Sequence, residues 1–372
     1  MGNRDLNKLR IWSELSDQDM ERPVEEIEKP FWDRGAKSLK EYLEEIRDKH
    51  AKNGEDESTS NLDKWNTKAE RLRYMLKHTL GCPDTFEFRR EEIKILRTMY
   101  GCYPSNSHRN ANTPVHTTNT PDYIDSIEVT DEEVVESFQY EINHTDGSLR
   151  QYLKHASIAA VVGNTIFVHG AIDALTMKFV PSLESKFHLP KSSPPSFTAI
   201  SSVTTSVEDG TIIDNVHDWV QALNEFLQHG LKDFELRPDW NEERSSRGGE
   251  ALLAIQNRPS MWGRSVVCNS YGDGGVIATV DSEEERKQAL RMAEEQNYPL
   301  AFEGIASSVF DPEPAKWLLD HGIQRIVVGH KPTGDCPAVL SSRYTGKKIF
   351  ILDRHFVLLD RPFLLLTLKD IF

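Results

Sequence analysis

The sequence predicts an α/β fold that carries a large helical insertion. Two short apolar runs separated by turn residues are typical of a β-hairpin over 158–169. The last third of the chain alternates helix-like and strand-like segments, and an apolar run at 323–328 ends in Gly-His. Ahead of the hairpin, apolar residues recur at helical spacing over much of 16–140. These three observations together favour a sheet with helices added to it.

The chain begins with the turn sequence Gly2-Asn3-Arg4-Asp5, which leads directly into a helix pattern. A Gly-Asn pair is typical of the connection from a strand into a helix, where α/β enzymes hold catalytic groups. Asp5 is the expected N-cap of a helix whose apolar residues run from Leu6 to Leu15. Because no residues precede Met1 to form the strand, we expect the sequence to start in mid-fold, truncated at its N-terminus.

The long interval between this turn and the hairpin reads as mostly helical. Amphipathic stripes fall at 39–46, 62–76 and 93–99, with polar loops between them. We expect 16–146 to form a helical insertion or cap over the site that shapes substrate choice. The alternative is that it only stabilises one edge of the fold, because helix periodicity does not show which residues line a pocket.

A histidine directly follows the second strand of the predicted hairpin. Apolar residues 158–162 and 165–168 flank Gly163-Asn164, and His169-Gly170 follows the second run. A second insertion is expected over 181–250. It begins with a Ser/Pro-rich loop and continues as an amphipathic helix closed by Gly230 at its C′ position.

A second histidine follows a second strand. Asp311, Pro312 and Gly322 mark the start and end of a helix, because Pro is favoured at the first helical position and Gly just past the last. The apolar run 323–328 then reads as a strand that ends in Gly329-His330.

Composition limits the possible partners. The chain has 44 basic and 59 acidic residues, a net charge of −15, which argues against a nucleic-acid surface and against binding to anionic membranes. Its four cysteines show no paired spacing, so we expect a reducing compartment. We expect no leader, because the first residues show neither a basic-apolar nor a transit-peptide pattern, and the longest apolar stretch, 356–366, is interrupted by charges and Pro. We therefore expect a cytoplasmic protein.

Three motifs in this order resemble those of the calcineurin-like metallophosphoesterases, in particular the phosphoprotein-phosphatase branch with its bacterial-like members. Gly2–Asp5 stands in the place of Gly-Asn-His-Glu, Phe167–Ala171 in the place of Val-His-Gly-Gly, and Val328–Pro332 in the place of Gly-His-x-Pro. The resemblance implies one domain over 1–372, a four-layer αββα sandwich incomplete at its N-terminus.

The resemblance also implies metal chemistry. In that family two metal ions (Mn, Fe or Zn) are bridged by an aspartate and a water, and the activated water attacks phosphorus. Carried over by position, Asn3, His169 and His330 would be ligands of the second metal. The family's ligands for the first metal precede Gly-Asn-His-Glu and have no counterpart here, so at most one metal is supported.

Two arginines are the candidate catalytic residues. Arg4 replaces the family's histidine proton donor; it cannot act as a general acid at ordinary pH, but it can hold phosphate oxygens. Arg264, in Trp262-Gly263-Arg264, stands where bacterial-like members have a phosphate-binding arginine. An arginine beside a tryptophan is as often a packing pair, and that alternative stays open.

The leading hypothesis is a metal-dependent phosphoesterase acting on a phosphorylated protein, a dinucleotide polyphosphate or a small phosphate ester. Because two histidines and one amide provide no anionic ligand, we expect weak metal binding and little or no activity from this polypeptide. The alternative is a catalytically inactive interaction protein on the same fold. A third interpretation is an unrelated α/β protein with chance Gly-His turns.

Overall fold

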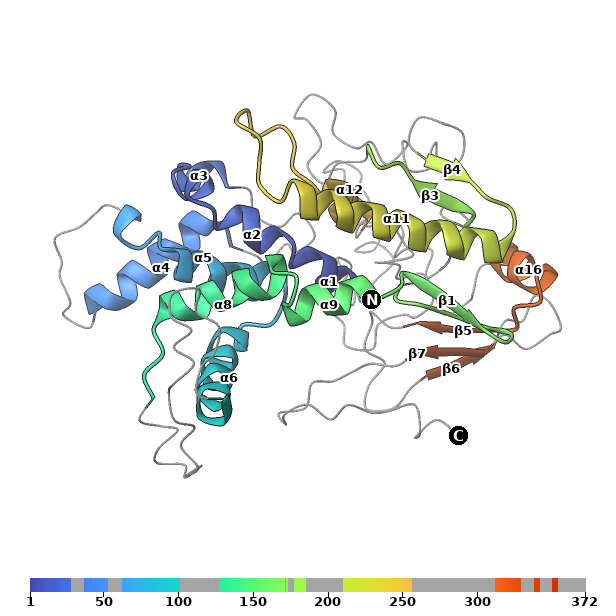
Figure 1. Cartoon of the computed structure of the whole chain (residues 1–372), viewed down its shortest axis with the longest axis horizontal. Coiled ribbons are helices and arrows are strands. Elements are labelled where there is room, and N and C mark those ends of the chain that lie inside the picture. Colours follow the sequence, from blue (N-terminus) through green and yellow to red (C-terminus); the bar gives the residue numbers. More distant parts are fainter. Residues whose placement is uncertain are drawn as a thin grey trace, which may run out of the picture.

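A computed structural model describes residues 1–27, 37–52, 62–100, 127–170, 172, 177–184, 210–255, 312–328, 338–341 and 350–353 (Figure 1). The helices before the hairpin are α1 (Asn3–Asn7), α2 (Arg10–Glu14), α3 (Asp17–Met20), η1 (Val24–Glu26), α4 (Leu39–Lys52), η2 (Leu62–Lys64), α5 (Lys68–Tyr74), η3 (Met75–Thr79), α6 (Thr85–Tyr100), α8 (Asp131–Asn143) and α9 (Ser148–His155). Those after it are α11 (Val216–Leu236), α12 (Glu250–Ile255) and α16 (Pro312–Asp320). The strands are β1 (Ala159–Val162), β2 (Thr165–Val168), β3 (Phe179–Pro181), β4 (Gly210–Ile212), β5 (Arg325–Val328), β6 (Ala338–Ser341) and β7 (Phe350–Asp353).

Five of these strands form one sheet in the order β1-β2-β5-β7-β6. β1 and β2 pair antiparallel as the predicted hairpin, and Gly163 in its turn has φ +59°, a conformation that favours glycine. β2 and β5 are parallel neighbours, with Phe167 opposite Val327. Both strands therefore end at the same edge of the sheet, which is where the His169 and Gly329-His330 sequences begin.

Helix α11, 21 residues long, lies between the five-stranded sheet and the β3–β4 pair (Figure 1). The Asn215 side chain caps its start by accepting hydrogen bonds from the next turn. The expectation that Gly230 closes this helix was wrong, because the helix continues to Leu236. Position 230 is glycine for another reason: a β-carbon there would lie 2.4 Å from Cγ of Leu252, on α12.

The outer edge of β1 is partly covered by a side chain from α11. Oδ1 of Asn224 accepts hydrogen bonds from the backbone nitrogens of Ile158 (2.9 Å) and Ala159 (3.4 Å). Its Nδ2 donates to the carbonyl of Ala159 at 2.9 Å. One amide side chain thus provides the hydrogen bonds that a neighbouring strand would make.

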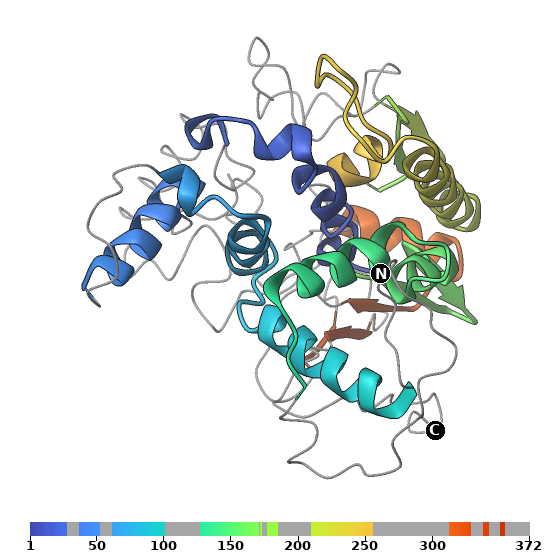
Figure 2. The same ribbon diagram turned by 60° about the vertical axis from the view of Figure 1, so that its left-hand side comes forward.

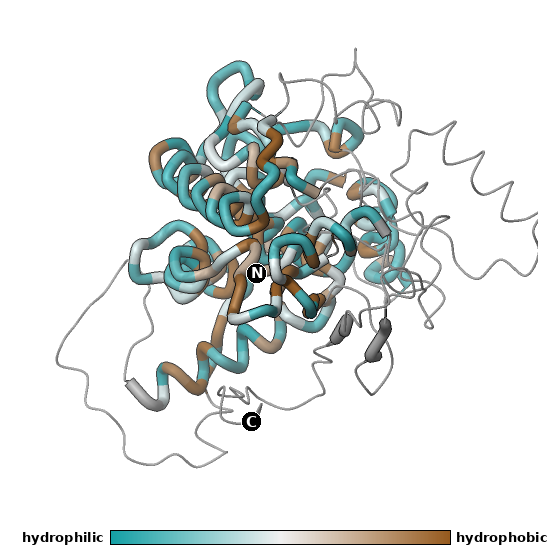
Figure 3. Tube along the Cα trace, turned by 90° about the vertical axis from the view of Figure 1, so that its right-hand side faces the viewer, coloured by the Kyte–Doolittle hydropathy of each residue, from teal (hydrophilic) through white to brown (hydrophobic). Residues whose placement is uncertain are grey.

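The helices before the hairpin gather at one side of the molecule (Figure 2). Arg71, which is 3% exposed, fixes α5 to the start of the chain by donating to the carbonyls of Asp19 (2.6 Å) and Met20 (3.2 Å). Thr130 and Glu133 form a capping box at the start of α8. Apolar and polar stretches follow one another along the helices, as expected where apolar residues recur every three or four positions (Figure 3). Within the described ranges, no helix has the length and apolar character needed to cross a bilayer.

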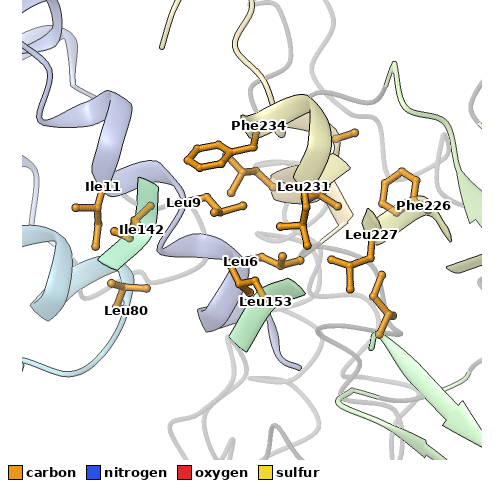
Figure 4. Close-up of a cluster of buried hydrophobic side chains, with 14 of the residues drawn as sticks. Leu6, Leu9, Ile11, Leu80, Ile142, Leu153, Phe226, Leu227, Leu231 and Phe234 are labelled. Carbon is orange, nitrogen blue, oxygen red and sulfur yellow. The ribbon is translucent and has the colours of Figure 1, made fainter. Parts of the chain in front are cut away.

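A single cluster of buried apolar side chains joins these parts. Leu6 of α1 and Leu9, just before α2, belong to this cluster. So do Leu153 of α9 and Leu227 and Phe234 of α11 (Figure 4). The same cluster includes side chains from β2 and β5. The first residues of the chain are therefore packed into the core, and this packing holds the Gly2–Asp5 turn in place. The four-layer sandwich and the two insertions remain predictions.

Candidate functional site

The Gly2–Asp5 turn starts α1, but not at the expected cap. Gly2 is the N-cap residue and the helix begins at Asn3, so the assignment of Asp5 as N-cap was wrong. Asp5 is instead the third helical residue, and its carboxylate accepts a hydrogen bond from the backbone nitrogen of Gly2 at 2.8 Å. This reaching-back contact satisfies a donor that the helix start would otherwise leave unpaired.

Asn3 and His169 meet although 166 positions separate them. Oδ1 of Asn3 lies 3.0 Å from Nε2 of His169, which follows the last residue of β2. An amide oxygen can only accept, so Nε2 carries the proton in this arrangement. Two of the three predicted metal ligands are thus brought together, one from a helix start and one from a strand end.

The His169 ring packs directly on Gly2. A β-carbon at position 2 would come within 2.7 Å of Cε1 and 2.8 Å of Nδ1 of His169. Burial lowers the pKa of His169 to about 4; the Arg4 charge acts in the same direction, and Asp5 partly opposes it. The imidazole is therefore neutral at neutral pH, which is the form that binds metal ions.

The Asp5 carboxylate is held by three donors. Besides Gly2, the Tyr152 hydroxyl of α9 donates to Oδ2 at 3.1 Å, and Nζ of Lys8 lies 3.4 Å from Oδ1. Burial acts to raise the pKa of Asp5, but Lys8 and the hydrogen bonds outweigh it and the pKa falls below its usual value. Asp5 therefore serves as a fixed negative charge that keeps the turn in shape.

Arg4 is exposed, and its guanidinium lies over Gly81. A β-carbon at Gly81 would be 3.1 Å from Nη2 of Arg4, and Gly81 has φ +66°. Within the described ranges, Arg4 has no hydrogen-bond or ion-pair partner. A guanidinium placed one residue from Asn3, with no ion-pair partner among the described residues, is well suited to an anionic ligand.

His330 and Arg264 lie outside the described residues. What the structure does place is the strand ahead of His330. β5 ends at Val328, and it runs parallel to β2 in a register that aligns their carboxyl ends. The two histidine-bearing segments therefore leave the sheet at the same edge.

The donor chemistry fits part of a metal site. Two ligands that each lie about 2.1 Å from one ion, at a right angle, are about 3 Å apart, and Asn3 Oδ1 and His169 Nε2 are 3.0 Å apart. An amide oxygen and an imidazole suit Mn, Fe or Zn, provided that His169 adopts the tautomer with its proton on Nδ1 and leaves Nε2 free to bind. No group of three or more His, Cys, Asp or Glu side chains gathers in the part of the chain that the structure describes. The pair is thus a partial ligand set.

Sequence reasoning missed three contributors to this site. The steric need for glycine at Gly2 and at Gly81 depends on contacts with distant residues, although Gly81-Cys82-Pro83 does carry a turn signal. Tyr152 lies in an ordinary amphipathic pattern, and nothing in that pattern points to Asp5.

No family model, no curated protein and no solved structure matches this chain.

Proposed function

We propose that this protein is a metal-dependent phosphoesterase in which Asn3, His169 and His330 hold one divalent ion. The observation that carries the proposal is the contact of Asn3 Oδ1 with His169 Nε2 at 3.0 Å. The parallel pairing of β2 with β5 supports it, because the strands that precede His169 and His330 have their carboxyl ends side by side. The substrate would be a phosphorylated protein or a small phosphate ester in the cytoplasm.

Each residue has a defined part in this proposal. When bound, the ion would polarise a phosphoryl oxygen and activate water. Asn3 and the neutral His169 would orient it, with His169 in the tautomer whose proton is on Nδ1, so that Nε2 is free to bind. Arg4 would hold phosphate oxygens through its guanidinium, and Arg264 is a second candidate for that role. Neither arginine would supply a proton to the leaving group.

The same ligand set predicts low activity. Asn3, His169 and His330 are all neutral ligands, so they do not offset the charge of the ion. The Asp5 carboxylate is already engaged by Gly2, Lys8 and Tyr152. We expect weak metal binding and little or no phosphatase activity from the 372-residue polypeptide.

A catalytically inactive interaction protein is the second candidate. The neutral donor set favours it, because a site without an anionic ligand binds a divalent ion weakly and therefore leaves most copies of the chain without the ion. Both candidates share the fold and differ in whether any turnover depends on the ion.

Binding of Mn²⁺ followed by electron paramagnetic resonance tests the proposal. We expect one site, weakened about tenfold or more by Asn3→Ala, His169→Ala or His330→Ala. His229→Ala, an exposed histidine of α11, is the matched control and should leave the affinity unchanged. Equal binding by all of these variants would place the metal elsewhere and refute the ligand assignment.

Hydrolysis of p-nitrophenyl phosphate separates the two candidates. Slow turnover that requires Mn²⁺ and is lost with His169→Ala would favour the phosphoesterase. No turnover above that of the His169→Ala variant, together with intact Mn²⁺ binding, would favour the inactive protein. Rapid turnover would contradict the expectation of an impaired site.

A further inference from the structure

A loop from the helices before the hairpin lies beside Arg4 of the candidate site. This loop, residues 80–83, lies between η3 and α6, and Gly81 within it supports the guanidinium of Arg4. A second tie joins the same regions: Nδ2 of Asn7, which is 3% exposed, donates to the carbonyl of Thr79 at 3.1 Å. Helix α1 is therefore tied to the residue just before the loop, one turn past Arg4.

The loop is held rigidly by the turn that precedes it. η3 is a π-helical turn, a rare geometry that occurs frequently at functional sites. The backbone nitrogen of Leu80 donates to Met75 at 3.0 Å, and that of Cys82 donates to Leu76 at 2.8 Å. Leu76 and Leu80 are 1% and 2% exposed, so the loop is anchored in the core.

Two observations bear on a side chain at position 81. Its φ of +66° is one that L side chains rarely adopt, and a β-carbon would lie 3.1 Å from Nη2 of Arg4, so the exposed end of that side chain would have to shift by a few tenths of an ångström. The first concerns the backbone alone, whereas the second concerns only Arg4. Gly163 has the same kind of backbone conformation, with φ +59°, but a β-carbon there would meet nothing within 4 Å. It is therefore a control for the backbone effect alone.

We propose that the 80–83 loop is one wall of the phosphate-binding site, and that Gly81 is a positioning residue that sets where the Arg4 guanidinium meets a phosphoryl group. This inference deepens the proposed function and rests on it for the identity of the ligand. It gives the helical segment a direct role: the loop behind Arg4 determines how far a phosphate can enter beside Asn3.

The test is the affinity for inorganic phosphate, measured by calorimetry with and without Mn²⁺. Arg4→Ala should weaken phosphate binding about 30-fold, the size of a lost charge-assisted hydrogen bond. Gly81→Ala should weaken it about tenfold. Gly81→Asn should do the same while folding more readily, because Asn tolerates positive φ. Gly163→Ala should leave phosphate affinity unchanged.

The double variant Arg4→Ala/Gly81→Ala distinguishes positioning from a general structural effect. If Gly81 acts through Arg4, adding Gly81→Ala to Arg4→Ala should cause no further loss of phosphate affinity. An additive loss, or an equal loss in Gly163→Ala, would overturn the inference. So would the absence of measurable phosphate binding by the wild-type chain.

The inference and the proposed function can fail separately. Mn²⁺ binding that depends on His169, with phosphate affinity indifferent to Arg4 and Gly81, would overturn the inference and leave the metal assignment standing. Phosphate binding that depends on Arg4 and Gly81, without Mn²⁺ binding, would support the role of the 80–83 loop in phosphate binding and refute the metal site.

Discussion

The imidazole of His169 lies against the α-carbon of Gly2 so closely that a β-carbon there would be 2.7 Å from Cε1. Gly2 has φ −119° and ψ 172°, an extended conformation that any residue adopts. Glycine is therefore required at this position by contact, and backbone strain plays no part. The start of α1 and the end of β2 fit together only because position 2 has no side chain.

Gly2→Ala should lower the free energy of unfolding by about 1–3 kcal/mol, because the added methyl group overpacks the His169 ring. Urea unfolding measures this loss. In the Gly2→Ala/His169→Ala double variant the obstacle is removed, so Gly2→Ala should cost less there than in the wild-type background. An equal cost in both backgrounds would show that the ring is not what excludes a side chain.

The pKa of His169, lowered by burial to about 4 against 6.5 for an exposed histidine, should make stability depend on pH. The unfolded chain takes up this proton first as the pH falls. The part of the free energy of unfolding that depends on His169 being neutral amounts to at most about 3 kcal/mol. It is fully present above pH 6.5 and is lost as the pH falls from 6.5 to about 4. Urea unfolding between pH 4 and 7 should show this slope, and His169→Gln should flatten it. The exposed His229→Gln should not; identical slopes in both variants would contradict the assignment.

Tyr152→Phe should destabilise the protein by about 1 kcal/mol, because the Asp5 carboxylate loses one of its three donors. Tyr140→Phe is the matched control, since the Tyr140 hydroxyl has no hydrogen-bond partner in the described part of the chain. Thermal unfolding of the two variants gives the comparison. If Tyr140→Phe cost as much as Tyr152→Phe, the contact with Asp5 would contribute nothing specific.

Gly230→Ala tests the packing of α11 on α12. In the interior of a helix this change alone would stabilise by about 1 kcal/mol. Here the new β-carbon would lie 2.4 Å from Cγ of Leu252, so we expect a net loss of about 1–3 kcal/mol in urea unfolding. Leu252→Ala should cost less in the Gly230→Ala background than alone. A stabilised Gly230→Ala protein would mean that the helices do not meet at this point.

Local patterns predicted the elements that local sequence controls. The 158–168 hairpin follows from two apolar runs around Gly163, and it is confirmed. Helix α16 begins at Pro312 and ends before Gly322, whose φ of +81° fits the expected terminating role. The strand predicted at 323–328 is β5. In each case the signal lies within a few residues of the element.

Two predictions failed, the N-cap role of Asp5 and the helix end at Gly230, and both inferred a helix end from residue type alone. Gly230 resembled a helix end because helices often end in glycine, yet here it makes room for Leu252. The Asn3–His169 pair could be anticipated only through the resemblance to a known family, since periodicity carries no information across 166 positions. For Gly81 the sequence offered a turn signal but nothing to connect it with Arg4.

The amide of Asn224 has a consequence for how copies of this chain behave toward one another. An open strand edge invites pairing with a strand from another molecule, and among the described strands β1 is the outermost on its side of the sheet. By occupying the outward backbone groups of Ala159, Asn224 removes the first rung that an incoming strand would use. A side chain of α11 thus occupies the start of the β1 edge, where it competes with pairing by a strand from another copy.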